Sequence, residues 1–263
     1  MATLHRIMLY PVKSLDGVEV DSARVLPEGA LEHDRRWRLV DTEGRVVNAK
    51  RTAAIHRIRV EYDLGDESVR LSLRDAAESR SERFPLVPGG TGPCGWLSEA
   101  IHVEVRLEER RDGGFPDDRE APGPTIISTA SLAEVAGWFS LDLAESRRRF
   151  RTNLEIEGCD AFWEDTLASP SPAEPAEFSI GEVKFRGTNV CRRCVVPSRD
   201  SRTGDVAAAF REAFEARRSR GLRPDVDAAD WHGFYRLAVN TTLSSEGGTL
   251  AVGQPVTSYR ERK

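Results

Sequence analysis

Short runs of alternating apolar and polar residues, separated by turn residues, dominate the first half of the chain from residue 5 to residue 107. Alternation with a period of two places one face of a strand on a core and the other face in water. The apolar positions of two such runs are Ile58, Val60 and Tyr62, then Val69, Leu71 and Leu73. The pattern predicts a sheet-rich or barrel-like N-terminal domain.

Two pairs of runs are typical of hairpins. Residues 7–12 and 18–25 flank the turn sequence Lys-Ser-Leu-Asp-Gly, and residues 37–41 and 45–49 flank Thr-Glu-Gly. Turn residues between two apolar runs favour antiparallel pairing of those runs. We therefore expect two hairpins before residue 50.

A domain boundary is expected near residue 120. Residues 108–124 are rich in glycine, proline and charge, so they offer little apolar surface to offset the entropy lost on ordering. We interpret this stretch as a linker. It separates an N-terminal domain, residues 1–120, from a second domain, residues 121–263.

The second domain combines strands with added helices. Ser131 and Glu134 resemble a capping box, followed by apolar residues at helical spacing. After a proline-rich loop at 168–176, residues 178–185 predict a hairpin, 206–214 an amphipathic helix, and 235–240 and 250–256 closing strands around a Gly-Gly turn. The expected fold class is α+β, mainly β, with an N-terminal β-barrel-like domain followed by a second β-barrel domain with helices.

Composition excludes several classes of protein. The net charge of -5 argues against nucleic-acid binding, which usually depends on a basic face. No signal-peptide pattern and no run of about 20 apolar residues is present, so we expect a cytoplasmic protein without a membrane span. Four cysteines are too few and too scattered for a disulfide framework in 263 residues.

The segment Cys191-Arg-Arg-Cys194 carries the main chemical signal. A structural zinc site needs four ligands, and the other two cysteines are isolated. A thioredoxin-like dithiol needs a βαβ context that is missing here. A buried pair of small hydrophobes is the plain alternative. The cationic neighbours Arg192, Arg193, Arg199 and Arg202 favour a thiolate, either as a nucleophile or as a soft-metal ligand.

This segment resembles the signature of the molybdenum-cofactor-sulfurase C-terminal (MOSC) domain, in which Cys-x-x-Cys is followed by Pro, Asp and Thr-Gly. Further segments resemble one branch of that family, the mitochondrial amidoxime-reducing component and its bacterial relatives, in an order that runs along nearly the whole chain. They are Tyr10-Pro11-Val12-Lys13-Ser14 with Gly17, Asp34-Arg35-Arg36-Trp37, Arg149-Phe150-Arg151-Thr152-Asn153, Gly158-Cys159-Asp160 with Glu164-Asp165, Ile180-Gly181, and Gly233-Phe234-Tyr235.

The resemblance implies a molybdenum cofactor, a pterin whose dithiolene binds the metal. It makes the thiolate of Cys194 a direct metal ligand and leaves Cys191 in packing or secondary redox chemistry. It places Tyr235 near the metal as a catalytic residue. The expected cofactor-binding residues are Lys13, Ser14, Arg35, Arg36, Arg151, Asn153 and Arg193.

The basic run at 147–151 has two interpretations. Such a run is usually a solvated face. If the segment is a strand, however, Arg151 and Asn153 point the same way and could together donate to a pterin and its phosphate. The resemblance assigns both residues to cofactor binding.

The implied activity is reductive removal of oxygen from small N-hydroxylated or other N-oxygenated substrates, at a site between two β-rich domains. Electrons would come from a separate ferredoxin or flavoprotein reductase, because the chain has no cluster of closely spaced cysteines after residue 194. Two alternatives remain open. One is a sulfur carrier or cofactor-handling protein with a cysteine persulfide, and the other is a non-catalytic cofactor-binding module.

Overall fold

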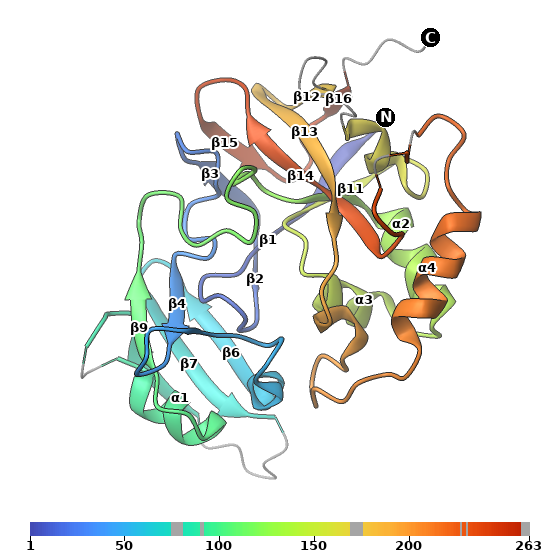
Figure 1. The fold of residues 1–263 in the computed structure, drawn as a ribbon. Coiled ribbons are helices and arrows are strands. Elements are labelled where there is room, and N and C mark those ends of the chain that lie inside the picture. The colour runs from blue at the N-terminus through green and yellow to red at the C-terminus, as the bar shows by residue number, and fades with distance from the viewer. Residues whose placement is uncertain (75–80, 90–91, 169–175, 227, 230, 259–263) are drawn as a thin grey trace.

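The computed structural model describes residues 1–74, 81–89, 92–168, 176–226, 228–229 and 231–258 (Figure 1). Strands dominate these residues, so the expected mainly-β, α+β class is confirmed. The α-helices are α1 (Cys94–Ile101), α2 (Thr129–Trp138), α3 (Leu143–Phe150) and α4 (Phe210–Arg220). Short 3-10 turns are η1 (Ala53–Arg57), η2 (Trp163–Leu167) and η3 (Val196–Ser198). Most of the proline-rich loop expected at 168–176 lies outside the described residues.

The strands form four sheets. The largest has the order β16-β12-β13-β14-β10-β11-β1-β2, and smaller sheets have the orders β15-β3, β5-β4-β9 and β6-β7-β8. The strands are β1 (Thr3–Leu9), β2 (Val18–Val20), β3 (Ser22–Val25), β4 (Trp37–Val40), β5 (Val46–Val47), β6 (Ile58–Asp63), β7 (Ser68–Leu73), β8 (Glu82–Pro85), β9 (Arg106–Glu109), β10 (Ile126–Ser128), β11 (Leu154–Glu157), β12 (Ala176–Ile180), β13 (Val183–Arg192), β14 (Arg236–Leu243), β15 (Gly248–Ala251) and β16 (Val256–Ser258).

The expected hairpins are present, with one difference. β1 pairs with β2, β4 with β5, and β12 with β13, all antiparallel. The run 18–25, however, divides at Asp21 into β2 and β3, which have different partners. Alternation fixes which face of a strand is buried but does not fix its neighbour, so the sequence could not reveal this division.

The first strands join the two halves of the chain. β1 pairs with β11 as well as with β2, and β3 pairs with β15. Strands β4 to β9 and helix α1 instead form a separate lobe at the lower left of Figure 1, while α2, α3 and α4 lie beside the large sheet. The domain boundary at residue 120 stays a prediction, and the N-terminal strands pair across it.

The large sheet curls so that β1 comes close to the end strand β16, but the described strands do not form a closed barrel. The backbone N–H of Val256 donates to the carbonyl of Ala2, and Leu4 exchanges backbone hydrogen bonds with Gly253 and Gln254. These bonds bring the start of β1 against the segment that leads into β16.

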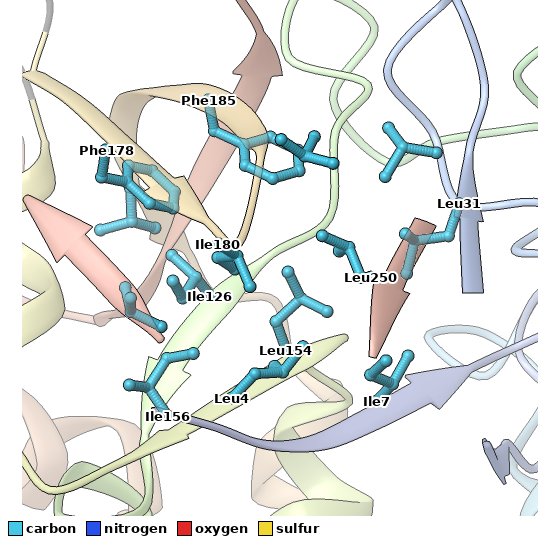
Figure 2. Packing of buried hydrophobic residues seen from close by; sticks show 14 of the residues in the cluster. Leu4, Ile7, Leu31, Ile126, Leu154, Ile156, Phe178, Ile180, Phe185 and Leu250 are labelled. Atoms are coloured by element: carbon cyan, nitrogen blue, oxygen red, sulfur yellow. The ribbon is translucent and has the colours of Figure 1, made fainter. Parts of the chain in front are cut away.

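Three hydrophobic clusters hold these parts together. The first fills the curl of the large sheet, and Figure 2 shows Leu4, Ile7 and Leu31 packed toward Leu154 and Leu250 from distant parts of the sequence. The second lies inside the β4–β9 lobe, around the fully buried Trp37. The third packs the helices on the sheet through Phe150, Phe210 and Phe214. Each alternating run thus buries the face that its pattern predicts.

The sequence patterns predicted the starts of two helices at the wrong residues. The N-cap of α2 is Ser128, whose hydroxyl accepts a hydrogen bond from the backbone N–H of Ser131 (3.0 Å), so the expected cap at Ser131 is wrong. Helix α4 begins at Phe210, because Ala209 adopts a left-handed conformation (φ 54°) and Val206 is 56% exposed. The expected helix from residue 206 therefore starts four residues too early.

The predicted linker at 108–124 is also partly wrong. Glu108 and Glu109 belong to β9, which pairs with β4. The carboxylate of Glu108 accepts a hydrogen bond from Arg38 (2.7 Å) on the neighbouring strand, so the charge that suggested a linker makes a cross-strand ion pair.

A buried ion pair ties α4 to the 3-10 turn η2. The guanidinium of Arg218 donates to the carboxylate of Asp165, and both side chains are fully buried. Arg218 also lies over the rings of Phe162 (4.2 Å) and Trp231 (5.1 Å). Removal of one partner would leave the other charge buried without compensation.

We predict that Arg218→Met lowers the free energy of unfolding by about 3–5 kcal/mol, because the Asp165 carboxylate remains in the interior. Urea denaturation measures the change. Arg211→Met is the matched control on the same helix, since the Arg211–Glu215 pair is exposed, and it should cost less than about 1 kcal/mol. Equal losses for the two variants would show that burial of the Arg218 pair has no special effect.

Candidate functional site

A cleft with a volume of about 820 Å³ lies where the β4–β9 lobe meets the large sheet. Its walls come from the turn after β1, the loop before β10, the end of α3, the end of β13 and the middle of β14. Most of the predicted site residues line it, namely Lys13, Ser14, Arg35, Arg151, Asn153, Arg193 and Cys194. Arg36 and Tyr235 do not.

The two cysteines of the motif have different environments. Cys191 is buried in β13, where its Sγ donates to Oδ1 of Asn240 at 2.8 Å. Burial raises the pKa of the Cys191 thiol to about 11, although Arg193 acts in the opposite direction. Cys194 lies just beyond the end of β13, is half-buried and faces the cleft. The geometry therefore makes Cys194 the accessible sulfur and Cys191 a neutral, packed thiol.

The cation next to Cys194 is directed toward helix α3. The guanidinium of Arg193 donates to the carbonyl of Phe150, at the C-terminal end of α3, and lies 5.5 Å from the centre of the Phe150 ring. A cation at this end complements the negative end of the helix dipole. The backbone N–H of Arg193 also donates to the carbonyl of Tyr235 (2.8 Å), which fixes the residues before Cys194.

Lys13 and Ser14 form the tight turn that the sequence predicts. Ser14 adopts a left-handed conformation with φ 76°. The Lys13 ammonium donates to the Phe115 and Pro116 carbonyls (3.0 and 3.4 Å) and pairs with the Asp117 carboxylate at 2.9 Å. Desolvation acts to raise the pKa of Asp117, but Arg35 and Lys13 outweigh it and hold the pKa well below its usual range. The Lys13 ammonium is thus already bound by two carbonyls and a carboxylate of the protein.

Several neighbours hold Arg35 in place, among them the Arg151 carbonyl, to which its guanidinium donates (3.5 Å). Its guanidinium pairs with the carboxylate of Asp34 and donates to Oδ1 of Asn153 at 3.2 Å. The same Oδ1 accepts hydrogen bonds from Thr125, and Nδ2 of Asn153 donates to the carbonyl of Met8 (2.9 Å). Asn153 is therefore mainly a brace between β1, the loop before β10 and Arg35, and only its second Nδ2 hydrogen is left for a ligand.

Arg151 does not lie in a strand, as one interpretation of the basic run supposed. It is the left-handed C-cap of α3, with φ 52°. Its guanidinium lies 4.1 Å from the centre of the Tyr10 ring, a cation–π contact, and no described carboxylate pairs with it. Arg151 lines both the large cleft and a smaller one of about 390 Å³, so it stays available to an anionic ligand.

The rest of the basic run is not a simple solvated face. Arg147 pairs with Glu155 (2.6 Å), while Arg148 and Arg149 both pair with Glu145 (2.9 and 2.6 Å). Arg149 is only 7% exposed. Three of the arginines therefore stabilise α3 and its packing.

Arg36 belongs to the predicted cofactor-binding set but does not line the cleft. Its buried guanidinium pairs with Glu67 (2.7 Å) and Glu109 (2.5 Å) and lies 4.3 Å from the centre of the Trp37 ring. Arg35 lies in a turn with a left-handed conformation (φ 50°) and lines the cleft, whereas Arg36 faces the β4–β9 lobe. We assign Arg36 to the stability of that lobe.

Tyr235 lies behind the cleft wall. It is buried against Phe210 and Phe214 in edge-to-face contacts, with ring centres 6.5 and 5.1 Å away. Among the described residues its hydroxyl has no hydrogen-bond partner. Burial raises the pKa of that hydroxyl, Arg193 opposes the increase, and negative charge on Cys194 adds to it. Tyr235 is thus close to Cys194 electrostatically but does not line the cleft.

Several cleft residues were missed by the sequence reasoning. Asp117 and Asp118 lie in the stretch interpreted as a linker, and Asn189 and Asn240 lie on strands. Single polar residues in a loop or strand carry no motif, so no local signal could have found them. The fold alone gathers them around the cysteines.

The donor set of the cleft fits a metal that arrives inside an anionic organic ligand. One accessible thiolate can complete a coordination sphere, and Lys13, Arg35 and Arg151 provide cations for an acidic group. The described residues contain no group of three or more His, Cys, Asp or Glu side chains that could hold a metal ion by themselves. Nor is any helix among them both long and apolar enough to cross a bilayer.

The fold and cleft define a sheet-rich protein with one accessible cysteine on a cationic wall. Family models agree with this class: the MOSC N-terminal beta barrel domain matches residues 1–85, and the MOSC domain matches residues 124–257. The chain belongs to the MOSC-domain family, which confirms the resemblance seen in the motifs.

Two kinds of relative are similar to the chain. Mitochondrial amidoxime-reducing component 1 of Homo sapiens is 26% identical over 296 aligned positions, which cover 97% of this chain and 82% of that protein; the Mus musculus protein is 24% identical, with the same coverage. Molybdenum cofactor sulfurase of Drosophila yakuba is 28% identical over 228 aligned positions, covering 77% of this chain. The chain spans only 28% of the length of that sulfurase.

We predict that iodoacetamide at pH 7.5 alkylates Cys194 at least about tenfold faster than Cys191, because thiolate is the reactive form and a pKa near 11 keeps Cys191 protonated. Peptide mass spectrometry over time gives both rates. Cys194→Ser should remove the fast site without exposing Cys191. Equal rates in the native protein would contradict the burial of Cys191.

Proposed function

We propose that the protein is a molybdenum-cofactor-dependent oxidoreductase of the cytoplasm that removes oxygen from small N-hydroxylated or other N-oxygenated compounds. The observation that carries the proposal is the half-buried Cys194 on a wall that also presents Lys13, Arg35 and Arg151. Similarity to the amidoxime-reducing components supports it, because the alignment extends over most of both chains.

The chain's own residues divide the work of binding. Cys194 would supply the protein's thiolate to the metal, and a soft sulfur donor suits such a centre. Lys13, Ser14 and Arg35 would bind the phosphate, with Arg151 as a further cation and Arg193 holding the segment before Cys194. When bound, the cofactor supplies the redox chemistry. Electrons would come from a separate ferredoxin or flavoprotein reductase.

Cys191 and Tyr235 affect the electrostatic environment of Cys194 without binding the cofactor themselves. The neutral Cys191 thiol adds no second negative charge beside Cys194, so the two sulfurs do not repel each other. The buried Tyr235 hydroxyl lies close to Cys194 behind the wall, where it can influence the thiolate's surroundings.

A second candidate is a sulfur carrier or cofactor-handling protein, with a persulfide on Cys194. The similarity to molybdenum cofactor sulfurase favours it, although the chain spans a minor part of that relative. The accessible Cys194 suits either role. A non-catalytic cofactor-binding module would have the same cleft but no turnover.

We predict that protein purified from a cofactor-competent host contains molybdenum and pterin and reduces benzamidoxime with a chemical electron donor. Cys194→Ser should abolish this reduction, because the metal loses its protein ligand. Cys191→Ser, the matched control, should keep activity within about tenfold, since it alters only a supporting hydrogen bond. Elemental analysis, pterin fluorescence and product chromatography measure these outcomes.

Three results would redirect the assignment. Labile sulfur on Cys194 without molybdenum would favour the carrier. Bound cofactor without reduction of any N-oxygenated compound would favour the binding module. A greater loss in Cys191→Ser than in Cys194→Ser would exchange the roles of the two cysteines.

A further inference from the structure

The part of the cleft formed by Asp118, Asn189 and Asn240 carries a negative charge, unlike the cationic wall. Two other carboxylates of the cleft are paired with cations, Asp117 with Lys13 and Asp34 with Arg35. No ion pair among the described residues involves Asp118. No described cation therefore lies within ion-pair distance of its carboxylate, although Arg119 and Arg192 line the same cleft.

Four neutral donors fix the Asp118 carboxylate. Oδ1 accepts hydrogen bonds from the backbone N–H groups of Glu120 (3.0 Å) and Ala121 (3.3 Å). Oδ2 accepts from the side-chain amides of Asn240 (3.2 Å) and Asn189 (3.5 Å). Neutral donors orient a carboxylate but leave its net charge, so the group is preorganised to interact with a cation. The long contact from the exposed Asn189 is the one that a charged donor could most easily replace.

This carboxylate is also near the motif cysteines. Asn240 joins them directly, because its Nδ2 donates to Asp118 while its Oδ1 accepts from the thiol of Cys191 at 2.8 Å. Cys191, Cys194, Asp118 and Asn240 all line the same cleft. A ligand that reaches Cys194 therefore meets a fixed negative charge as well as the cationic wall.

We infer that Asp118 is the recognition group for substrates that carry N–H donors beside the N–O bond, namely N-hydroxylated amidines and guanidines. This inference rests on the proposed reductase function. An anionic cofactor belongs at the cationic wall, because Asp118 would repel it. The carboxylate end is left for a donor-bearing or cationic ligand, and a neutral N-oxide without N–H groups gains nothing from it.

The chemistry of the reaction agrees with this placement. Reduction of an amidoxime breaks the N–O bond and consumes two electrons from the ferredoxin or flavoprotein donor together with three protons. The products are water and an amidinium ion. Positive charge thus develops on the substrate nitrogens as the bond breaks, and a fixed carboxylate stabilises such charge more in the transition state than in the neutral substrate. Asp118 is then a specificity-determining residue of the same cleft.

The test compares benzamidine, the cationic product of benzamidoxime, with benzamide, its neutral analogue of similar shape. Calorimetric titration of the full-length protein at low salt should show a preference of at least about tenfold for benzamidine. Asp118→Asn should remove that preference. Asp117→Asn is the matched control, because it removes an adjacent carboxylate already paired with Lys13, and it should keep the preference.

A second variant, which adds a negative charge, keeps the inference testable if Asp118→Asn does not fold. Asn189 is exposed beside Asp118, so Asn189→Asp should increase the preference for benzamidine. Unchanged selectivity in both Asp118→Asn and Asn189→Asp would overturn the inference, as would an equal loss in Asp117→Asn. If the wild type selects benzamidine through Asp118 but never reduces benzamidoxime, the recognition site stands and the proposed reductase function fails.

Kinetics add a separate readout. In active enzyme, Asp118→Asn should lower kcat/KM for benzamidoxime by about tenfold or more and leave kcat/KM for pyridine N-oxide, which has no N–H donor, unchanged. Equal losses for the two substrates would mean that Asp118 is only structural, which contradicts the inference.

Discussion

The antiparallel pairing of β1 with β11 is the constraint on which the rest of the structure depends. It brings the tenth to fourteenth residues of the chain against residues 151–153, and two further hydrogen bonds between Met8 and Asn153 fix that approach. Lys13 and Ser14 then face Arg151 across the cleft, although more than 130 residues separate them in sequence. Without this pairing Lys13 and Ser14 would not lie in the same cleft as Arg151.

The charge that the cleft offers to a ligand depends on which of its charged side chains are already paired with each other. Asp34 and Asp117 hold Arg35 and Lys13 in place, so an incoming phosphate must compete with groups of the chain itself. Arg151 is different, because its described contact is the face of an aromatic ring. Asp118 is the opposite case, an anion fixed by neutral donors. Together they give one cleft two regions of unlike charge in a protein whose overall charge is modestly negative.

Much of the fold could be predicted from local sequence patterns, but less of the candidate site could. The alternating runs at 58–63 and 68–73 form β6 and β7 as expected, because burial of one face is encoded in a period of two. The motif does not reveal which of its two arginines reaches the cleft, because Arg35 lies in a turn (φ 50°) and Arg36 pairs with Glu67 and Glu109. The strand interpretation of Arg151 was wrong, because the residue is a helix C-cap with left-handed backbone geometry, which the surrounding arginines do not reveal.

The sequence by itself determined the mainly-β class and the hairpins, and it singled out the Cys191-x-x-Cys194 segment, since these depend on neighbouring residues and short spacings. The tertiary structure decided which strands are partners, which cysteine is accessible, and where Asp118 stands relative to the motif. The reason is physical: periodicity states which face is buried but not against what, and burial, charge pairing and cleft geometry arise only when distant segments meet.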